Sequence, residues 1–239
     1  MTEPNQGPNP GPSPDRGASV VAARLTLFGV PRLWLHDRAV AVGSRKAMAL
    51  LLLMALDGGC SRDYLVRMLW PELDAAAARR NLRRDLFRLR KAGVPVLEGD
   101  AEQLVLGPQF AVQSMAEPAG PQRFEPALRG LDGVAGVEFD AWLARTRAAL
   151  EQRRSQDWRR EAAALVAQGQ ADAALALLDA LLGLDACDEA AALQAMALLQ
   201  ARGRADAALA VYGRMERALA ELELPPSAAA RAQRDALRP

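Results

Sequence analysis

The first third of the chain alternates apolar and polar positions in the pattern of β-strands. Leucines recur at every second position, a period of two that is typical of strands, in two places: Leu25 and Leu27, then Leu33 and Leu35. The segment 29–31, Gly-Val-Pro, predicts a turn between them, and Val40 and Val42 indicate a third short strand. The chain therefore begins its ordered part with a small sheet, near Arg24.

Helical periodicity follows, and three residues mark where helices begin. Ser44, Ser61 and Asp74 have short polar side chains that accept hydrogen bonds from the first free backbone amides of a helix. They predict helices that end before glycine or proline: residues 45–57, 62–69 and 75–92. Residues 94–97 and 103–106 then flank a polar turn and predict a β-hairpin. Strands, three helices and a hairpin together predict an α+β winged helix-turn-helix domain over residues 24–113.

An internal repeat organises the second half of the chain. Residues 167–176 recur as residues 201–210 with eight identities in ten positions, an offset of 34 residues. That period is typical of tetratricopeptide repeats, in which Gly169 and Gly203 would lie in the turns between paired helices. We expect an all-α, tetratricopeptide-like domain over residues 122–239. Residues 1–23 hold five prolines and three glycines, which predicts a disordered tail.

Charge divides the chain in the same way. Residues 24–112 carry 14 Lys and Arg against 9 Asp and Glu, a net of +5, whereas residues 113–239 carry 15 against 18, a net of −3. This asymmetry predicts that the first domain meets a polyanion. Two distant cysteines and the lack of an apolar membrane segment indicate a cytoplasmic protein that does not bind membranes. No catalytic motif, cofactor loop or metal-binding spacing is present, so we expect neither an enzyme nor a cofactor.

The third predicted helix carries the strongest functional signal. Residues 79–91 hold seven positive charges and one negative charge, and such a cluster is self-repelling unless a polyanion faces it. The third helix of this motif enters the major groove of double-stranded DNA. The predicted base-facing residues are Arg80, Asn81, Arg83, Arg84 and Arg88. The predicted phosphate contacts are Arg45, Lys46, Arg62, Arg79, Arg90 and Lys91. The alternative is a solvated charged face.

Several other residues have a simpler structural interpretation. The hairpin turn is acidic, with Glu98, Asp100 and Glu102, so we expect it to contact DNA little, or only through its backbone N–H groups. Aromatic side chains at helical spacing favour packing in a core: Trp70, Phe139, Trp142 and Tyr212. His36 has no metal-ligating neighbours in sequence, and nothing lowers the pKa of the Cys60 thiol toward a redox role.

The chain resembles the SARP-type transcriptional activators, which join an OmpR-like winged helix to a bacterial transcriptional activation domain. In the first domain the similar stretches are residues 27–29, 45–47, 69–71 and 78–90. In the second domain they are residues 138–143, the two Gly-x-Ala-Asp-Ala-Ala-Leu turns, Val211-Tyr212 and residues 219–226. The resemblance implies binding to direct repeats near promoters, with the helical domain contacting a second copy of the chain or RNA polymerase. The acidic hairpin departs from the family pattern.

Two hypotheses follow. The first is a sequence-specific DNA-binding transcriptional regulator, an activator by resemblance, whose third helix binds promoter DNA. The second is a tetratricopeptide-type protein-interaction adaptor whose winged domain does not bind DNA, an alternative that the acidic hairpin and the near-neutral net charge of +1 favour.

Overall fold

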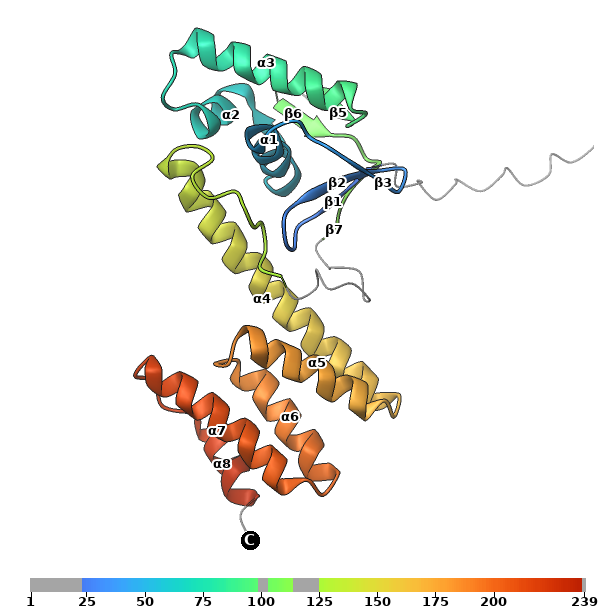
Figure 1. Cartoon of the computed structure of the whole chain (residues 1–239), viewed down its shortest axis with the longest axis vertical. Helices are drawn as coiled ribbons and strands as arrows, with labels where there is room; N and C mark the ends of the chain where they lie inside the picture. Colours follow the sequence, from blue (N-terminus) through green and yellow to red (C-terminus); the bar gives the residue numbers. More distant parts are fainter. Residues whose placement is uncertain (1–22, 99–102, 114–124, 238–239) are drawn as a thin grey trace, which may run out of the picture.

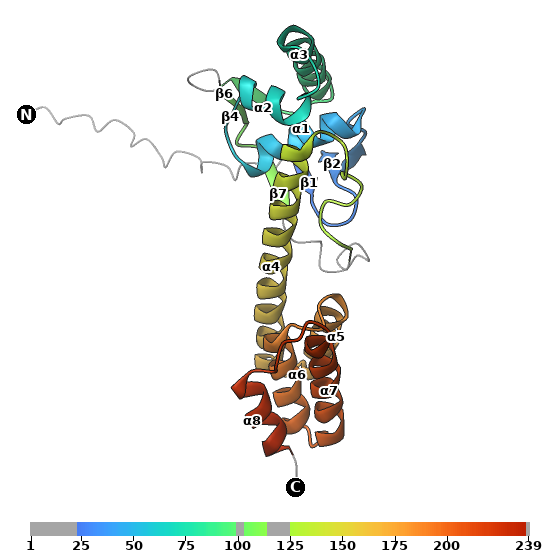
Figure 2. The ribbon, with the colours of Figure 1, turned by 90° about the vertical axis from the view of Figure 1, so that its left-hand side faces the viewer.

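The structure is a computed structural model that describes residues 23–98, 103–113 and 125–237. A winged-helix lobe and a helical lobe lie at opposite ends of an elongated molecule, and one long helix joins them (Figures 1 and 2). The predicted fold class, an α+β winged helix followed by an all-α repeat domain, is confirmed. The predicted tail, apart from Ala23 in the first strand, lies outside the described residues.

Two small sheets frame the winged-helix lobe. The first has the strand order β3-β2-β1-β7, with β1 and β7 parallel and the other pairs antiparallel. Its strands are β1 (Ala23–Thr26), β2 (Arg32–Leu35), β3 (Arg38–Val40) and β7 (Phe110–Gln113). The second has the order β4-β6-β5, with β4 (Cys60–Ser61), β5 (Val96–Glu98) and β6 (Gln103–Leu106). The predicted hairpin is therefore present as β5 and β6. The third strand, β3, ends at Val40, so Val42, which the pattern included in it, lies outside the strand.

Three helices pack between and beside these sheets. They are α1 (Arg45–Leu56), α2 (Arg62–Leu69) and α3 (Ala75–Lys91). Each predicted cap is confirmed, since the side chains of Ser44, Ser61 and Asp74 accept hydrogen bonds from the backbone amide three residues later. The helix α1 is buried along most of its length, which explains why its leucine run shows no clear apolar stripe.

Five helices make up the rest of the described chain: α4 (Val137–Ala167), α5 (Ala171–Leu184), α6 (Glu189–Ala201), α7 (Ala205–Glu221) and α8 (Ala228–Ala236). The repeat prediction is confirmed, because the turns from α4 to α5 and from α6 to α7 have matching geometry. Gly169 and Gly203 adopt φ of +75° and +70°, a region that glycine enters without strain. In each turn the amide that follows the glycine donates to a leucine carbonyl, Leu165 or Leu199.

The boundary between the two hydrophobic cores lies within α4. Buried residues up to Leu150 belong to the core of the winged-helix lobe, and buried residues from Trp158 onward belong to the core of the helical lobe. Phe139 and Trp142 are buried, as predicted, but they pack with the winged-helix core and not with the repeat helices. The first half of α4 thus anchors the helical lobe to the winged helix. The domain limits inferred from sequence, near residues 113 and 122, stay a prediction.

Candidate nucleic-acid interface

The helix α3 lies at the far end of the winged-helix lobe from α5–α8 (Figures 1 and 2). Ala78, Leu82, Leu86 and Leu89, spaced by three or four residues, are buried and fasten one face of the helix to the core. Asp74 caps its N-terminus by accepting a hydrogen bond of 2.8 Å from the amide of Ala77. The opposite face is left open.

That open face is basic. Its exposed cations come from successive turns of the helix and are Arg79, Arg80, Arg83, Arg84, Arg88, Arg90 and Lys91. Three of them, Arg80, Arg83 and Lys91, have no hydrogen-bond or ion-pair partner anywhere in the described part of the chain. Among the predicted base-facing residues, the four arginines are exposed, whereas Asn81 is half-buried at the edge of the helix. The structure thus places most of the predicted residues on one surface.

Sequence analysis missed the role of Asp85, the one acid within this basic helix. Its carboxylate is 1% exposed, and it accepts hydrogen bonds of 3.3 Å each from Arg84 Nε and Arg88 Nη1. A buried carboxylate needs such partners, because an unpaired buried charge is very unfavourable. Asp85 therefore draws Arg84 and Arg88 together on one flank of α3. Its position three residues after Leu82, on the apolar stripe, was the available signal.

The predicted phosphate-contacting side chains on α1 and α2 already interact with other groups of the protein. Lys46 Nζ lies 2.9 Å from Glu72 Oε1, and this lysine lowers the pKa of the Glu72 carboxyl. Arg45 Nη1 donates a hydrogen bond of 3.3 Å to the carbonyl oxygen of Gly130, toward α4 and away from α3. Arg62 is half-buried at the start of α2. These three cations belong to α1 and α2, and none of them lies on α3.

Arg79, a phosphate candidate on α3, forms an ion pair with another helix. Its Nη2 lies 3.2 Å from Asp63 Oδ1 of α2, and both side chains are largely exposed. A surface pair of this kind contributes little to stability and breaks easily when a phosphate competes for the arginine. The tip of the acidic hairpin, residues 99–102, lies outside the described residues.

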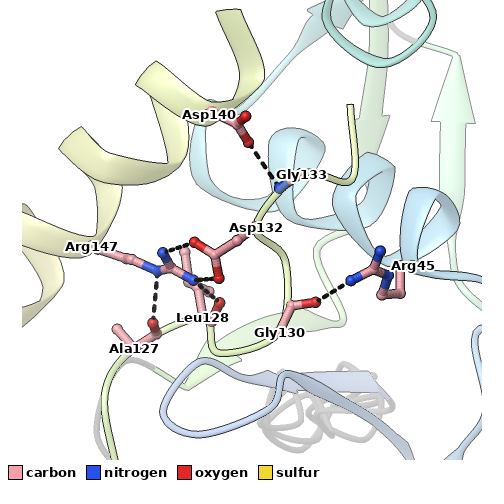
Figure 3. Close-up of polar contacts among 8 residues, drawn as sticks. All are labelled: Arg45, Ala127, Leu128, Gly130, Asp132, Gly133, Asp140 and Arg147. Carbon is pink, nitrogen blue, oxygen red and sulfur yellow. Dashed lines mark hydrogen bonds and ion pairs between the residues drawn. The ribbon is translucent and has the colours of Figure 1, made fainter. Parts of the chain in front are cut away.

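A second polar cluster joins the winged-helix lobe to α4 and the loop before it (Figure 3). The Arg147 guanidinium binds the Asp132 carboxylate through two nitrogens, at 2.6 and 2.9 Å. It also donates to the carbonyl oxygens of Ala127 and Leu128, at 3.2 and 2.8 Å. Arginine suits this arrangement because its planar fork presents five donors at once. Arg147 lowers the pKa of Asp132, and the loop is held against α4.

Two further contacts fasten α4 to the same lobe. The Asp57 carboxylate, at the end of α1, accepts hydrogen bonds from Trp142 Nε1 at 2.9 Å and from the Tyr64 hydroxyl at 2.8 Å. Arg154 lies between the rings of Phe28 and Trp158, with its guanidinium carbon 4.5 and 5.2 Å from the two ring centroids. Specific side chains therefore hold α4 against the winged-helix lobe.

The second half of the sequence matches a known protein family. Residues 112–238 match the bacterial transcriptional activator domain, a stretch that runs from the end of β7 through α8. The chain belongs to this family. The match covers the half of the sequence in which the helical repeat was found and confirms the resemblance to SARP-type activators. This family is a class of transcriptional regulators and not of enzymes.

A solved structure extends the likeness to the winged helix. EmbR from Mycobacterium tuberculosis, in complex with a low-affinity phosphopeptide, superimposes with a TM-score of 0.69 at 20% sequence identity. The alignment covers 90% of this chain and 65% of the EmbR chain, so the chain spans less than two thirds of the length of the protein it resembles. At this identity the likeness concerns the fold, and the phosphopeptide is a ligand of EmbR. A search of curated proteins found no match.

Two general features of the described residues complete the survey. No helix among them is long and apolar enough to cross a membrane. Within the same ranges, no three His, Cys, Asp or Glu side chains gather as metal ligands would. Cys60 is buried, and burial together with the nearby Asp57 carboxylate raises the pKa of its thiol to about 11, which leaves it a poor nucleophile.

Proposed function

We propose that this activator is a sequence-specific DNA-binding protein that recognises promoter DNA with α3. The observation that carries the proposal is the open face of α3, on which Arg80, Arg83 and Lys91 have no partner among the described residues. Seven cations on one helix repel one another, and DNA phosphates would remove that repulsion. Arginine also matches the O6 and N7 acceptors of guanine in the major groove.

The contacts divide into two groups under this proposal. Base contacts come from four exposed arginines of α3, Arg80, Arg83, Arg84 and Arg88, and from Asn81, which is half-buried at the edge of the helix. Phosphate contacts come from Arg79, Arg90 and Lys91 on α3, with Arg45, Lys46 and Arg62 from the other helices. Arg45 and Lys46 would first leave Gly130 and Glu72, so we expect them to contribute less than the cations of α3. The acidic hairpin would contribute little.

We assign contacts with other proteins to the helical lobe. Its position at the opposite end of the molecule from α3 leaves it accessible while DNA is bound (Figure 2). In this proposal it contacts RNA polymerase, or a second copy of the chain on an adjacent direct repeat. The contacts that fasten α4 to the winged helix would keep the two lobes in a fixed relation on the promoter.

The direct test is equilibrium binding to a DNA duplex that the wild-type protein selects from a random-sequence pool, measured over a salt series. In Arg80→Ala/Arg83→Ala, which removes two proposed base contacts, affinity for the selected duplex should fall at least about tenfold and its advantage over random-sequence DNA should shrink, since each bidentate base contact contributes about 1–3 kcal/mol of discrimination. The control is Arg153→Ala/Arg160→Ala, which removes two largely exposed arginines from α4. Equal effects in the two double variants, or no selected sequence, would reject the proposal.

One observation favours the alternative, a protein-interaction adaptor. An apolar groove of about 350 Å³ lies between α4 and α6, lined by Ala162, Ala163, Val166, Leu178, Gln194, Ala197, Leu198 and Ala201. Tetratricopeptide-type modules bind proteins along such stacked helices. An adaptor would show no salt-dependent DNA affinity, and its partner would be retained in Arg80→Ala/Arg83→Ala. The DNA-binding proposal is the better supported, because an adaptor role does not account for Arg80 and Arg83, which have no partner among the described residues.

A further inference from the structure

Phe87 is an apolar side chain in the middle of the basic face of α3. It is 65% exposed, whereas every other Phe, Tyr and Trp in the described ranges is buried or half-buried. Exposed aromatic rings forgo the stabilisation that burial would give. Alanine at this position would also have a higher helix propensity. Neither packing nor helix formation in the described protein therefore accounts for phenylalanine here.

Helical spacing places Phe87 among cations. Residues 80, 84, 87 and 91 are separated by four, three and four positions, so Arg80, Arg84, Phe87 and Lys91 form one stripe along the helix. Arg83 lies one turn before Phe87 on the same side. Opposite this stripe is the buried row that begins at Ala78. The ring thus stands at the centre of the open face, the part that reaches deepest when a helix enters a groove.

The surroundings of the ring favour a particular kind of ligand. A protein pocket for Phe87 would bring four arginines and lysines with it and would need matching acidic groups around an apolar centre. The DNA major groove has both features, with phosphates along its edges and the C5-methyl group of thymine on its floor. That methyl group is the one apolar base substituent the groove presents, and phenylalanine is among the side chains that contact it.

We propose that Phe87 is a specificity-determining residue that packs against the C5-methyl group of a thymine in the recognised sequence. The inference rests on the proposed DNA-binding function and adds a base preference to it. The arginines around the ring bind phosphates and guanine edges, while Phe87 requires thymine at one position of the site. It contributes through contact area, so its effect is independent of salt concentration.

Thymine-to-uracil substitution tests this contact because it removes the methyl group and keeps every hydrogen-bonding group of the base. Duplexes of the selected sequence would carry one uracil each, and their affinities for wild type and Phe87→Ala would be compared. Wild type should lose about fourfold affinity at one thymine, as expected for about one buried methylene-sized group. Phe87→Ala should bind the uracil and thymine duplexes equally at that position and should keep the wild-type salt slope.

Phe87 has no core contacts to lose, so Phe87→Ala should fold normally, which its circular dichroism spectrum would verify. The matched control is Arg80→Ala, which should weaken binding to all duplexes and retain the fourfold uracil effect. If wild type binds DNA but no uracil position distinguishes it from Phe87→Ala, the thymine contact is wrong and DNA binding stands. If Phe87→Ala loses self-association or polymerase contact with unchanged DNA preference, Phe87 is a protein contact and the inference is overturned. Absence of salt-dependent binding in wild type would instead reject the proposed function.

Discussion

Arginines occur in two settings in this molecule, and their partners distinguish them. On α3, Arg80 and Arg83 extend from the protein without partners in the described residues. At the junction with α4, Arg147 binds one carboxylate and two carbonyl oxygens, and Arg154 is 5% exposed between two aromatic rings. The first set is available to a ligand, and the second set is part of the fold.

The difference shows that positive charge alone does not mark a DNA-binding surface. Arg153 and Arg154 are adjacent in sequence, yet their side chains are 69% and 5% exposed. What separates structural from functional arginines is the supply of backbone carbonyls and carboxylates within reach, which only the folded chain determines. Substitutions at the two kinds of site should therefore affect different measurements.

The largest effect on stability is expected at Arg154. Its Nη1 donates to the carbonyl oxygen of Glu125 at 2.8 Å, and it pairs with Glu151. Arg154→Ala removes these bonds and leaves a gap between Phe28 and Trp158, which should lower the free energy of unfolding by about 3 kcal/mol. Urea unfolding followed by tryptophan fluorescence measures this. Arg153→Ala, the adjacent control, should stay within about 0.5 kcal/mol of wild type. Equal losses in both variants would contradict a structural role specific to Arg154.

A smaller loss is expected when the indole of Trp142 is replaced. Trp142→Phe removes the Nε1 hydrogen bond to Asp57, which should lower the free energy of unfolding by about 2 kcal/mol, because hydrogen bonds to charged acceptors are among the stronger ones. Trp34→Phe is a matched control, since the buried Nε1 of Trp34 has no partner among the described residues. That variant should lose less than about 1 kcal/mol. If both substitutions lower the free energy of unfolding equally, the hydrogen bond from Trp142 to Asp57 does not stabilise the packing of α4 on the winged-helix lobe.

Much of the fold could be predicted because its signals are local. The caps at Ser44, Ser61 and Asp74 and the glycine turns of the repeat each depend on a few consecutive residues. The strands β4 and β7 were missed for a physical reason. The strand β4 has only two residues, and β7 has four and pairs in parallel with β1, which is distant from it in the sequence. Neither strand is therefore long enough to show a recognisable period.

The candidate site was predicted in part. The exposed arginines of α3 follow from helical spacing and charge. The burial of Asp85 was missed although its place in the apolar row of α3 indicates it. The contacts of Arg45 and Trp142 do not follow from local pattern, because their partners are distant in the sequence. Arg45 and Trp142 each bind a residue 85 positions away in the sequence. No pattern in a single sequence indicates such a pairing.

A pH series sharpens the comparison at the junction. Arg147 holds the pKa of Asp132 below its usual range, so the ionised carboxylate stabilises the folded state above the ordinary aspartate pKa of about 4. That contribution is lost as pH falls through the lower pKa of the folded state. Asp132→Asn should therefore be less stable than wild type at pH 7, by at most about 1 kcal/mol because Asp132 is largely exposed to solvent. The difference should shrink as the pH falls below the ordinary aspartate pKa. A difference that is the same at acidic and neutral pH would mean that the amide substitution disturbs the loop for reasons other than charge.

The smallest effect is expected on α3 and has the opposite sign. Arg83 has no partner in the described structure and repels the cations around it, so Arg83→Ala relieves repulsion and introduces a residue of higher helix propensity. The free energy of unfolding should rise by about 0.5 kcal/mol at low salt, and the gain should shrink in 1 M salt because repulsion is screened. Thermal unfolding at both salt concentrations measures this, beside DNA affinity in the same variant. A protein that becomes slightly more stable as it loses DNA affinity has an arginine retained for binding, whereas a loss of stability would place Arg83 with Arg147 and Arg154 among the residues that maintain the fold.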